Sequence, residues 1–186
     1  MSFFLFPGQG SQKPGMGHDF YTDSPVARAV FEEAVEQLGP EFLNGIFQGE
    51  AAQVNQTTVA QPALLTVEVA IARHCIARGL MPTGCAGHSL GEIPALVIAG
   101  AVSFSDALRI TRERARLMSE NVPEGGMAAV MGLEAEQIEA ALPEGVQIAN
   151  YNGPSQTIIS GSKTGVEASV EALKAAGAKR VLPLAV

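Results

Sequence analysis

The segment Gly87-His88-Ser89-Leu90-Gly91 is the feature that most constrains the fold of this chain. Glycines stand on both sides of Ser89, as a sharp turn requires where no Cβ would fit. Residues 81–86 form a short run bounded by proline and glycine, typical of a buried strand, and residues 90–100 are apolar on nearly every face, which predicts a core helix. A strand, a sharp turn and a helix would hold the Ser89 hydroxyl at the helix N-terminus, as a nucleophile requires. The alternative is a serine in a glycine-rich turn without a chemical role.

Strand-like and helix-like segments alternate along the first part of the chain. We expect a strand over residues 2–6 and helices over 24–38, 60–77 and 105–120. Ser24 and Pro25 suit the N-cap and first position of a helix, and Gly39-Pro40 ends it. Alternation of helices with unbroken apolar strands predicts an α/β fold with a parallel sheet covered on both faces.

The pattern changes after Gly125-Gly126, where we place a subdomain boundary. Residues 127–132, 146–151, 157–160 and 179–186 are expected to be strands, and residues 134–142 and 162–176 helices. The order βαββαβ predicts a ferredoxin-like unit. Residues 1–125 would then belong to a larger α/β subdomain and residues 126–186 to the small one.

Composition excludes several classes of protein. Twelve Lys and Arg against nineteen Asp and Glu give a net charge of −7, which argues against nucleic acid or an anionic membrane as a partner. No segment is expected to approach the ~20 apolar residues of a membrane span, and no signal peptide is expected. Cys75 and Cys85 are interpreted as reduced residues of a cytoplasmic protein. His18, His74 and His88 lack the spacing of zinc ligands, so no metal is expected.

A glycine-rich loop, Pro7-Gly8-Gln9-Gly10-Ser11-Gln12, follows the first expected strand. It is not a dinucleotide loop, because Lys13 replaces the third glycine of that motif. Loops at the carboxyl ends of strands bring backbone amides close to ligands in α/β sheets. This loop can therefore supply a second oxyanion donor for Ser89, or it is a tight turn without a catalytic role.

The helix expected over residues 105–120 carries one anomalous charge. With about 100° per residue, Arg109, Arg112 and Arg116 fall on one side of the helix and Arg114 on the other. The side with Arg114 also carries Ala107, Ile110, Thr111, Leu117 and Met118. A buried guanidinium needs a partner, which is either a structural Asp or Glu or an anionic group of a substrate.

These features together resemble the malonyl-CoA:acyl-carrier-protein transacylase family, to which the acyltransferase domains of polyketide synthases are closely related. The resemblance is carried by FPGQGSQ at residues 6–12, GHSLGE at 87–92, Arg114 and the ferredoxin-like unit. Gln61-Pro62-Ala63-Leu64-Leu65, residues 150–161 and residues 175–186 are similar too. The implied fold is an α/β-hydrolase-like large subdomain, incomplete here, with an inserted ferredoxin-like subdomain.

The resemblance implies roles for particular residues. Ser89 would be the nucleophile and form a malonyl-serine intermediate, with the backbone amides of Gln9 and Leu90 as oxyanion hole and Arg114 bound to the malonyl carboxylate. His88 and Asn152 would line the substrate site, although the His88 side chain is expected to point away from the Ser89 hydroxyl. The partners would be malonyl-CoA, which is a substrate and not a cofactor, and acyl carrier protein, in cytoplasmic fatty-acid biosynthesis.

The chain departs from the family pattern in its general base. The family's base is a histidine that follows the last strand of the small subdomain, beyond Val186, and His18, His74 and His88 are poor substitutes. We therefore expect this chain to be one piece of a longer protein, to act with a C-terminal companion fragment, and to transfer malonyl groups poorly alone. The alternatives are an acyltransferase that loads another carrier in polyketide or malonate metabolism, an α/β-hydrolase thioesterase, and a scaffold without catalysis.

Overall fold

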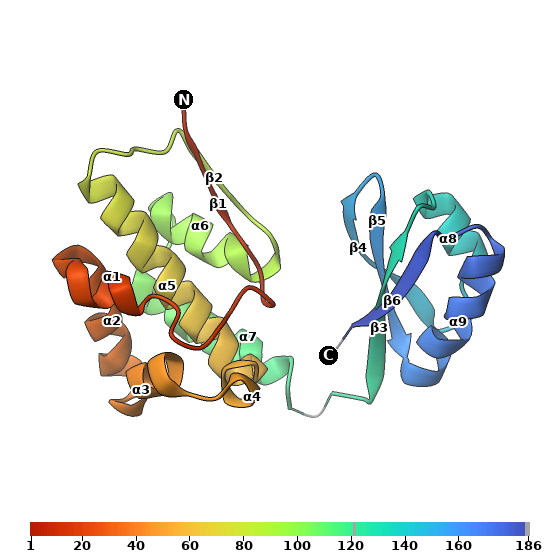
Figure 1. Cartoon of the computed structure of the whole chain (residues 1–186), viewed down its shortest axis with the longest axis horizontal. Helices are drawn as coiled ribbons and strands as arrows, with labels where there is room; N and C mark the ends of the chain where they lie inside the picture. Colours follow the sequence, from red (N-terminus) through yellow and green to blue (C-terminus); the bar gives the residue numbers. More distant parts are fainter. Residues whose placement is uncertain (121, 185–186) are drawn as a thin grey trace. The chain divides into compact units, whose positions relative to one another are not determined.

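The structure, a computed structural model, describes residues 1–120 and 122–184. It divides into two compact units, Met1–Glu120 and Asn121–Val186 (Figure 1). The boundary expected at Gly125-Gly126 lies shortly after this division.

A two-stranded parallel sheet holds the N-terminal strand in the first unit. Strand β1 (Phe3–Phe6) pairs with β2 (Gly84–Gly87), with Phe3 opposite Gly84 and Phe6 opposite Gly87 (Figure 1). Phe4 and Phe6 pack on one face against Ala72 and Ala95. The side chain of Leu5 on the other face is 76% exposed, and Phe3 is also exposed. The parallel pairing is confirmed, but cover on both faces is not, because the described elements of this unit pack on one face only.

Seven α-helices accompany this sheet among the described residues of the first unit. They are α1 (His18–Asp23), α2 (Pro25–Leu38), α3 (Glu41–Gln48), α4 (Ala51–Val54), α5 (Thr57–Ala77), α6 (Glu92–Ile98) and α7 (Phe104–Leu117). The predicted cap of α2 is confirmed, since Ser24 Oγ accepts a hydrogen bond of 3.2 Å from the Ala27 amide. The short helices α1, α3 and α4 were not predicted.

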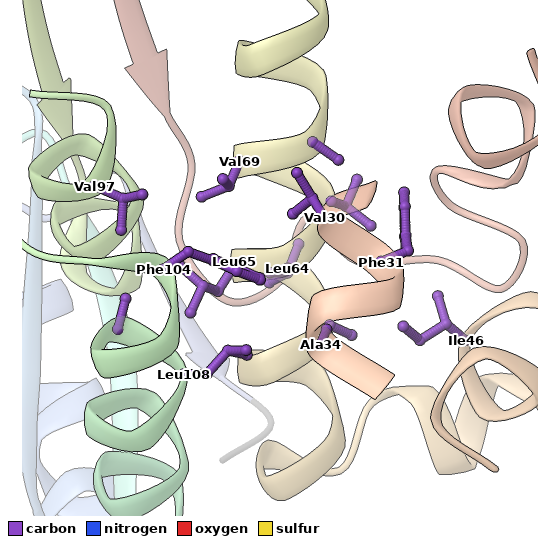
Figure 2. Packing of buried hydrophobic residues seen from close by; sticks show 14 of the residues in the cluster. Val30, Phe31, Ala34, Ile46, Leu64, Leu65, Val69, Val97, Phe104 and Leu108 are labelled. Carbon is purple, nitrogen blue, oxygen red and sulfur yellow. The ribbon is translucent and has the colours of Figure 1, made fainter. Parts of the chain in front are cut away.

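Helix α5 is the central helix of the first unit. It packs against α2 and α7, and the core between them includes Val30, Phe31, Leu65, Phe104 and Leu108 (Figure 2). The expectation that no segment approaches a membrane span is wrong for α5, which is long and apolar enough by length and composition. Its most apolar window is 67% buried within the structure, and core helices commonly pass the same test.

The second unit has the predicted βαββαβ order. Its elements are β3 (Gly125–Met131), α8 (Ala135–Ala141), β4 (Val146–Gly153), β5 (Gln156–Ser162), α9 (Lys163–Ala175) and β6 (Arg180–Leu184). The four strands pair antiparallel in the order β4-β5-β3-β6, which is the ferredoxin-like arrangement (Figure 1). Ser162 caps α9 as expected, through a hydrogen bond of 3.1 Å from the Gly165 amide. Residues 185–186 of the last expected strand lie outside the described part of the chain.

Candidate active site

Ser89 lies on a sharp turn between β2 and the helix that follows. Its φ of 54° is the one positive φ of a non-glycine residue among the described residues. A Cβ at Gly87 would overlap the backbone of Gly91, and a Cβ at Gly91 would overlap the Phe6 carbonyl. Both glycines are therefore required for β2, the turn and β1 to approach one another. A strained backbone at an exposed serine is typical of a nucleophile held out of a sheet.

The residues after Ser89 form the predicted apolar helix, which begins with a 3₁₀ turn. This turn (Ser89–Gly91) leads directly into α6, and Pro94 lies in the first turn of α6. The Leu90 side chain is fully buried and anchors the turn in the core. Amides in the first turn of a helix have no carbonyl partner within the helix, so the Leu90 amide is suited to bind a developing negative charge.

The glycine loop lies directly against the serine. The Gly8 backbone approaches so closely that a Cβ there would lie 2.9 Å from the His88 carbonyl oxygen and 3.6 Å from Ser89 Cβ. The His88 amide donates a hydrogen bond of 3.0 Å to the Phe6 carbonyl, which joins the two turns at the carboxyl ends of their strands. Gln9 is thus the next residue along a loop that is already in contact with the turn at Ser89.

Arg114 reaches Ser89 from α7. Its Nη2 donates a hydrogen bond of 2.9 Å to Ser89 Oγ, so the structure brings these two predicted residues together. Among the described residues of the first unit, no carboxylate forms an ion pair with Arg114, which removes the structural Asp or Glu as its partner there. The wheel placed Arg114 on the apolar, buried face of the helix, but in the structure Arg114 is only half-buried.

The helical side around Arg114 is partly open. Ile110, Leu117 and Met118 are exposed, although the helical wheel placed them on an apolar face with Ala107 and Thr111. The core contact of α7 is narrower and runs through Phe104, Ala107, Leu108, Thr111 and Ala115. The exposed side chains line an open groove with Arg114 among them. Asp106, Arg109 and Glu113 line the groove too, and Arg109 is paired with Asp106. Arg114 is thus the guanidinium of this mainly apolar groove that could bind the anionic end of a ligand.

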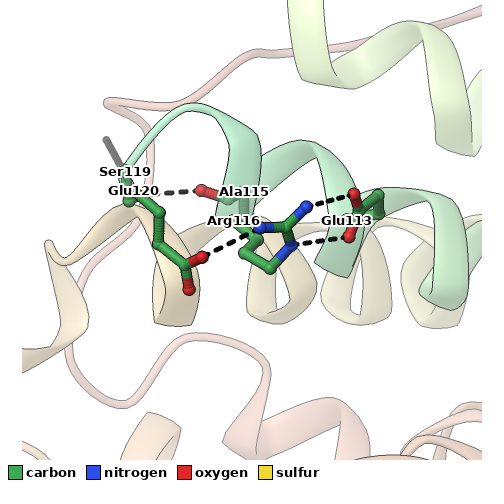
Figure 3. A network of polar contacts seen from close by, with 5 residues as sticks. All are labelled: Glu113, Ala115, Arg116, Ser119 and Glu120. Carbon is green, nitrogen blue, oxygen red and sulfur yellow. Dashed lines mark hydrogen bonds and ion pairs between the residues drawn. The ribbon is translucent and has the colours of Figure 1, made fainter. Parts of the chain in front are cut away.

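The other arginines of α7 are on the solvated side, as predicted. Arg116 donates hydrogen bonds to Glu113 Oε1 and Oε2 and to Glu120 Oε2 (Figure 3). The bond from Arg116 lowers the pKa of Glu113, and the two carboxylates raise the pKa of Arg116. Arg109 pairs with Asp106. These exposed pairs leave Arg114 as the arginine of α7 that is directed to Ser89.

The three histidines occupy different places. His18 packs edge-on against Phe47 at 4.9 Å between ring centroids, and His74 Nδ1 lies 2.7 Å from Ser24 Oγ. His88 is exposed, and its Nδ1 would lie 3.1 Å from a Cβ at Gly8.

Asn152 belongs to the second unit, near the end of β4, where its Nδ2 donates a hydrogen bond of 3.0 Å to Gln156 Oε1. The described residues hold no cluster of His, Cys, Asp or Glu that could bind a metal.

Two long, buried polar residues of α5 were given no role from the sequence. Gln61 is fully buried, and its Nε2 donates a hydrogen bond of 3.1 Å to Gln9 Oε1. Glu68 is 8% exposed, and neither of its carboxylate oxygens has a hydrogen-bond partner among the described residues. A signal for both was available, because each is a long polar residue within an otherwise apolar helix.

Comparison with known proteins gives consistent matches. The model of the acyl transferase domain family matches residues 3–186. The malonyl CoA-acyl carrier protein transacylase of Bacillus subtilis (strain 168) is 47% identical over 191 residues, covering 98% of this chain and 60% of that protein.

Solved structures agree with the sequence matches. A type II PKS acyl-carrier protein in complex with its malonyl-transacylase contains a chain with a TM-score of 0.93 and 45% identity, covering 100% of this chain and 63% of that one. The acyl carrier protein S-malonyltransferase of Vibrio cholerae O1 biovar eltor has a TM-score of 0.91 and 43% identity, covering 99% and 63%. The chain spans 60–62% of the length of the curated relatives that it matches first.

Proposed function

The chain belongs to the acyl transferase domain family, and from this premise we propose that Ser89 carries a malonyl group from coenzyme A to the phosphopantetheine thiol of an acyl carrier protein. The observation that carries the proposal is the hydrogen bond of 2.9 Å from Arg114 Nη2 to Ser89 Oγ on a strained turn. Relatives named as malonyl CoA-acyl carrier protein transacylases support this substrate and this acceptor. The reaction would serve fatty-acid biosynthesis in the cytoplasm.

The transfer proceeds in two balanced halves. Ser89 Oγ attacks the thioester carbonyl of malonyl-CoA and gives its proton to a base, and the carbon–sulfur bond then breaks as coenzyme A leaves with that proton. In the second half the carrier thiol loses its proton to the base and attacks the malonyl-serine ester, and Ser89 Oγ leaves and is reprotonated. In each half the oxyanion accepts hydrogen bonds from the backbone amides of Leu90 and Gln9. Loss of one such donor typically lowers the rate by roughly 10²–10³.

Arg114 accounts for the choice of a malonyl group. In a malonyl thioester one methylene separates the carboxylate from the carbonyl that reacts. A guanidinium within hydrogen-bonding distance of the nucleophile can therefore bind the carboxylate while Ser89 attacks the carbonyl. A planar guanidinium binds a carboxylate with two charge-assisted hydrogen bonds, which an acetyl group cannot accept. His88, beside the nucleophile, and Asn152 are further candidates to contact the substrate.

In this proposal the base lies in the segment of the relatives that this chain does not span, and the test supplies that segment as a companion polypeptide. The resemblance places a histidine there. The exposed Phe3 and Leu5 on the open face of the β1–β2 sheet offer an apolar surface for such a companion. We therefore expect slow malonyl transfer by the 186-residue chain alone and faster transfer after the companion is added.

Intact mass of the chain after incubation with malonyl-CoA or acetyl-CoA tests the proposal. The incubations include the companion segment of a family member as a second polypeptide. We expect a gain of one malonyl group on the wild type, none on Ser89→Ala, and a loss of preference for malonyl-CoA in Arg114→Ala. Arg112→Ala is the matched control, because Arg112 is exposed on the same helix.

Two results would contradict the proposal. No adduct on Ser89 in the presence of the companion would indicate a scaffold without catalysis. Rapid hydrolysis of both thioesters, indifferent to Arg114→Ala, would indicate a thioesterase. Transfer of the malonyl group to acyl carrier protein completes the test, with a polyketide carrier protein as the comparison.

A further inference from the structure

Gln61 is buried beside the oxyanion loop. It is fully buried in α5, where an uncompensated amide is unfavourable. Its Nε2 donates hydrogen bonds to Gln9 Oε1 at 3.1 Å and to Met118 Sδ at 3.4 Å. Its Oε1 is buried without a hydrogen-bond partner among the described residues. Gln61 is therefore held through its donor group, and this donor is directed to the loop.

The Gln9 side chain is held at both ends by α5. Gln9 Oε1 accepts from Gln61, and Gln9 Nε2 donates a hydrogen bond of 3.1 Å to Thr57 Oγ1. Thr57 and Gln61 are four residues apart, so they lie on the same face of the helix, one turn from each other. Both polar groups of an exposed loop residue are thus anchored to the central helix of the unit.

This anchor acts next to the nucleophile. The residue before Gln9 is Gly8, whose backbone packs against His88 and Ser89. The Gln9 amide lies between this contact and the anchored side chain. Rotation of this peptide would have to displace Gln9 from α5 or Gly8 from the turn.

Gln61 also joins the loop to the helix that carries Arg114. Its second acceptor, Met118, is the C-cap residue of α7 and lies one turn after Arg114. A single buried amide therefore contacts both the loop of the proposed oxyanion hole and the end of the helix of the proposed carboxylate site.

We propose that Gln61 is a positioning residue that holds the Gln9 backbone amide in place for the oxyanion. It also fixes the position of the Gln9 loop relative to the C-terminal end of α7. The inference rests on the proposed function, because it assigns Gln61 a role in acylation of Ser89. In this proposal Gln61 acts through its hydrogen bond to the Gln9 side chain.

A double-mutant cycle of Gln61→Met and Gln9→Ala tests this inference. Gln9→Ala keeps the backbone amide, and Gln9 is exposed, so this variant is not expected to unfold the chain. We expect each single variant to lower kcat for acylation roughly ten- to hundredfold with KM unchanged, since the lost interaction is made in the transition state. The double variant should be no slower than the slower single variant, because both break the same link. Thr66→Val is the matched control, since it removes another buried hydrogen bond of α5, to the Pro62 carbonyl.

The inference would be overturned if the fold-loss in kcat of the double variant equalled the product of the two single-variant losses. It would also be overturned by an effect on KM alone or by an equal loss of kcat in Thr66→Val. Hydrogen exchange of the Gln9 and Gly10 amides provides a second readout that does not require activity. It should accelerate in Gln61→Met and in Gln9→Ala but not in Thr66→Val, and unchanged exchange would also overturn the inference. If the wild type forms no adduct on Ser89, the proposed function fails, and exchange alone then decides whether Gln61 holds the loop.

Discussion

Glu68 offers a test of the buried interior that does not depend on activity. Its side chain is 8% exposed in α5, and its carboxylate oxygens have no hydrogen-bond partner in the described part of the chain. Burial disfavours the ionised form and raises the pKa of Glu68 from 4.5 to about 8. Replacement of Glu68 by glutamine keeps a similar shape and removes the ionisation.

The direction and size of the effect follow from linkage. The folded state holds the Glu68 proton more tightly than the unfolded state, whose pKa is near 4.5. The tighter binding of this proton stabilises the folded state. The stabilisation is fully present below pH 4.5 and is lost as the pH rises towards about 8. At about 1.36 kcal/mol per pKa unit, Glu68 alone lowers the free energy of unfolding by about 3 kcal/mol between pH 5 and pH 8.

Urea unfolding followed by circular dichroism at several values between pH 5 and pH 8 measures this effect. Glu68→Gln should be close to wild type at pH 5 and more stable than wild type by about 3 kcal/mol at pH 8. Glu32→Gln, which changes an exposed carboxylate on α2, should keep the wild-type dependence on pH. Parallel pH profiles for wild type and Glu68→Gln would refute the reasoning.

Two further substitutions test the turn and a helix cap. Gly91→Ala places a Cβ against the Phe6 carbonyl, so it should lower the free energy of unfolding by about 3 kcal/mol and block acylation of Ser89. The control is Gly45→Ala in α3, where a Cβ meets no atom within 4 Å. This control should be neutral or stabilising by up to about 1 kcal/mol. Thermal unfolding compares the two, and equal effects would contradict the role of Gly91. Ser24→Ala removes the acceptor of the Ala27 amide and the hydroxyl beside His74, and it should cost about 1 kcal/mol in urea unfolding. An unchanged midpoint would show that the cap is not needed.

The elements predicted correctly are those with local causes. The turn at Ser89 follows from its two glycines, and the start of α2 follows from Ser24 and Pro25, so neither requires knowledge of distant residues. Helices α3 and α4 were missed because each is short. Their buried residues, Ile46 and Val54, gain most of their stability from tertiary packing, which a local pattern does not reveal.

The candidate site was predicted in its residue types and less well in its environment. The helical wheel separated Arg114 from the other arginines, and the contact with Ser89 bears out that it is distinct. The wheel could not tell which apolar residues of α7 meet another element, so it placed the exposed Leu117 in a core. The bond between Gln61 and Gln9 joins residues 52 positions apart, and no local signal predicts such a pair.

The parallel pairing of β1 with β2 has a consequence for the order of folding. Phe3 pairs with Gly84, so this contact closes a loop of about eighty residues, and the approach of Gly8 to Ser89 depends on it. Closure of a long loop loses more chain entropy than local contacts do, and such pairings form slowly. We expect the strands of the second unit, whose pairings span fewer residues, to gain protection in pulsed hydrogen exchange before β1 does. Ser89 and the loop that carries Gln9 would then be among the last parts of the chain to come together.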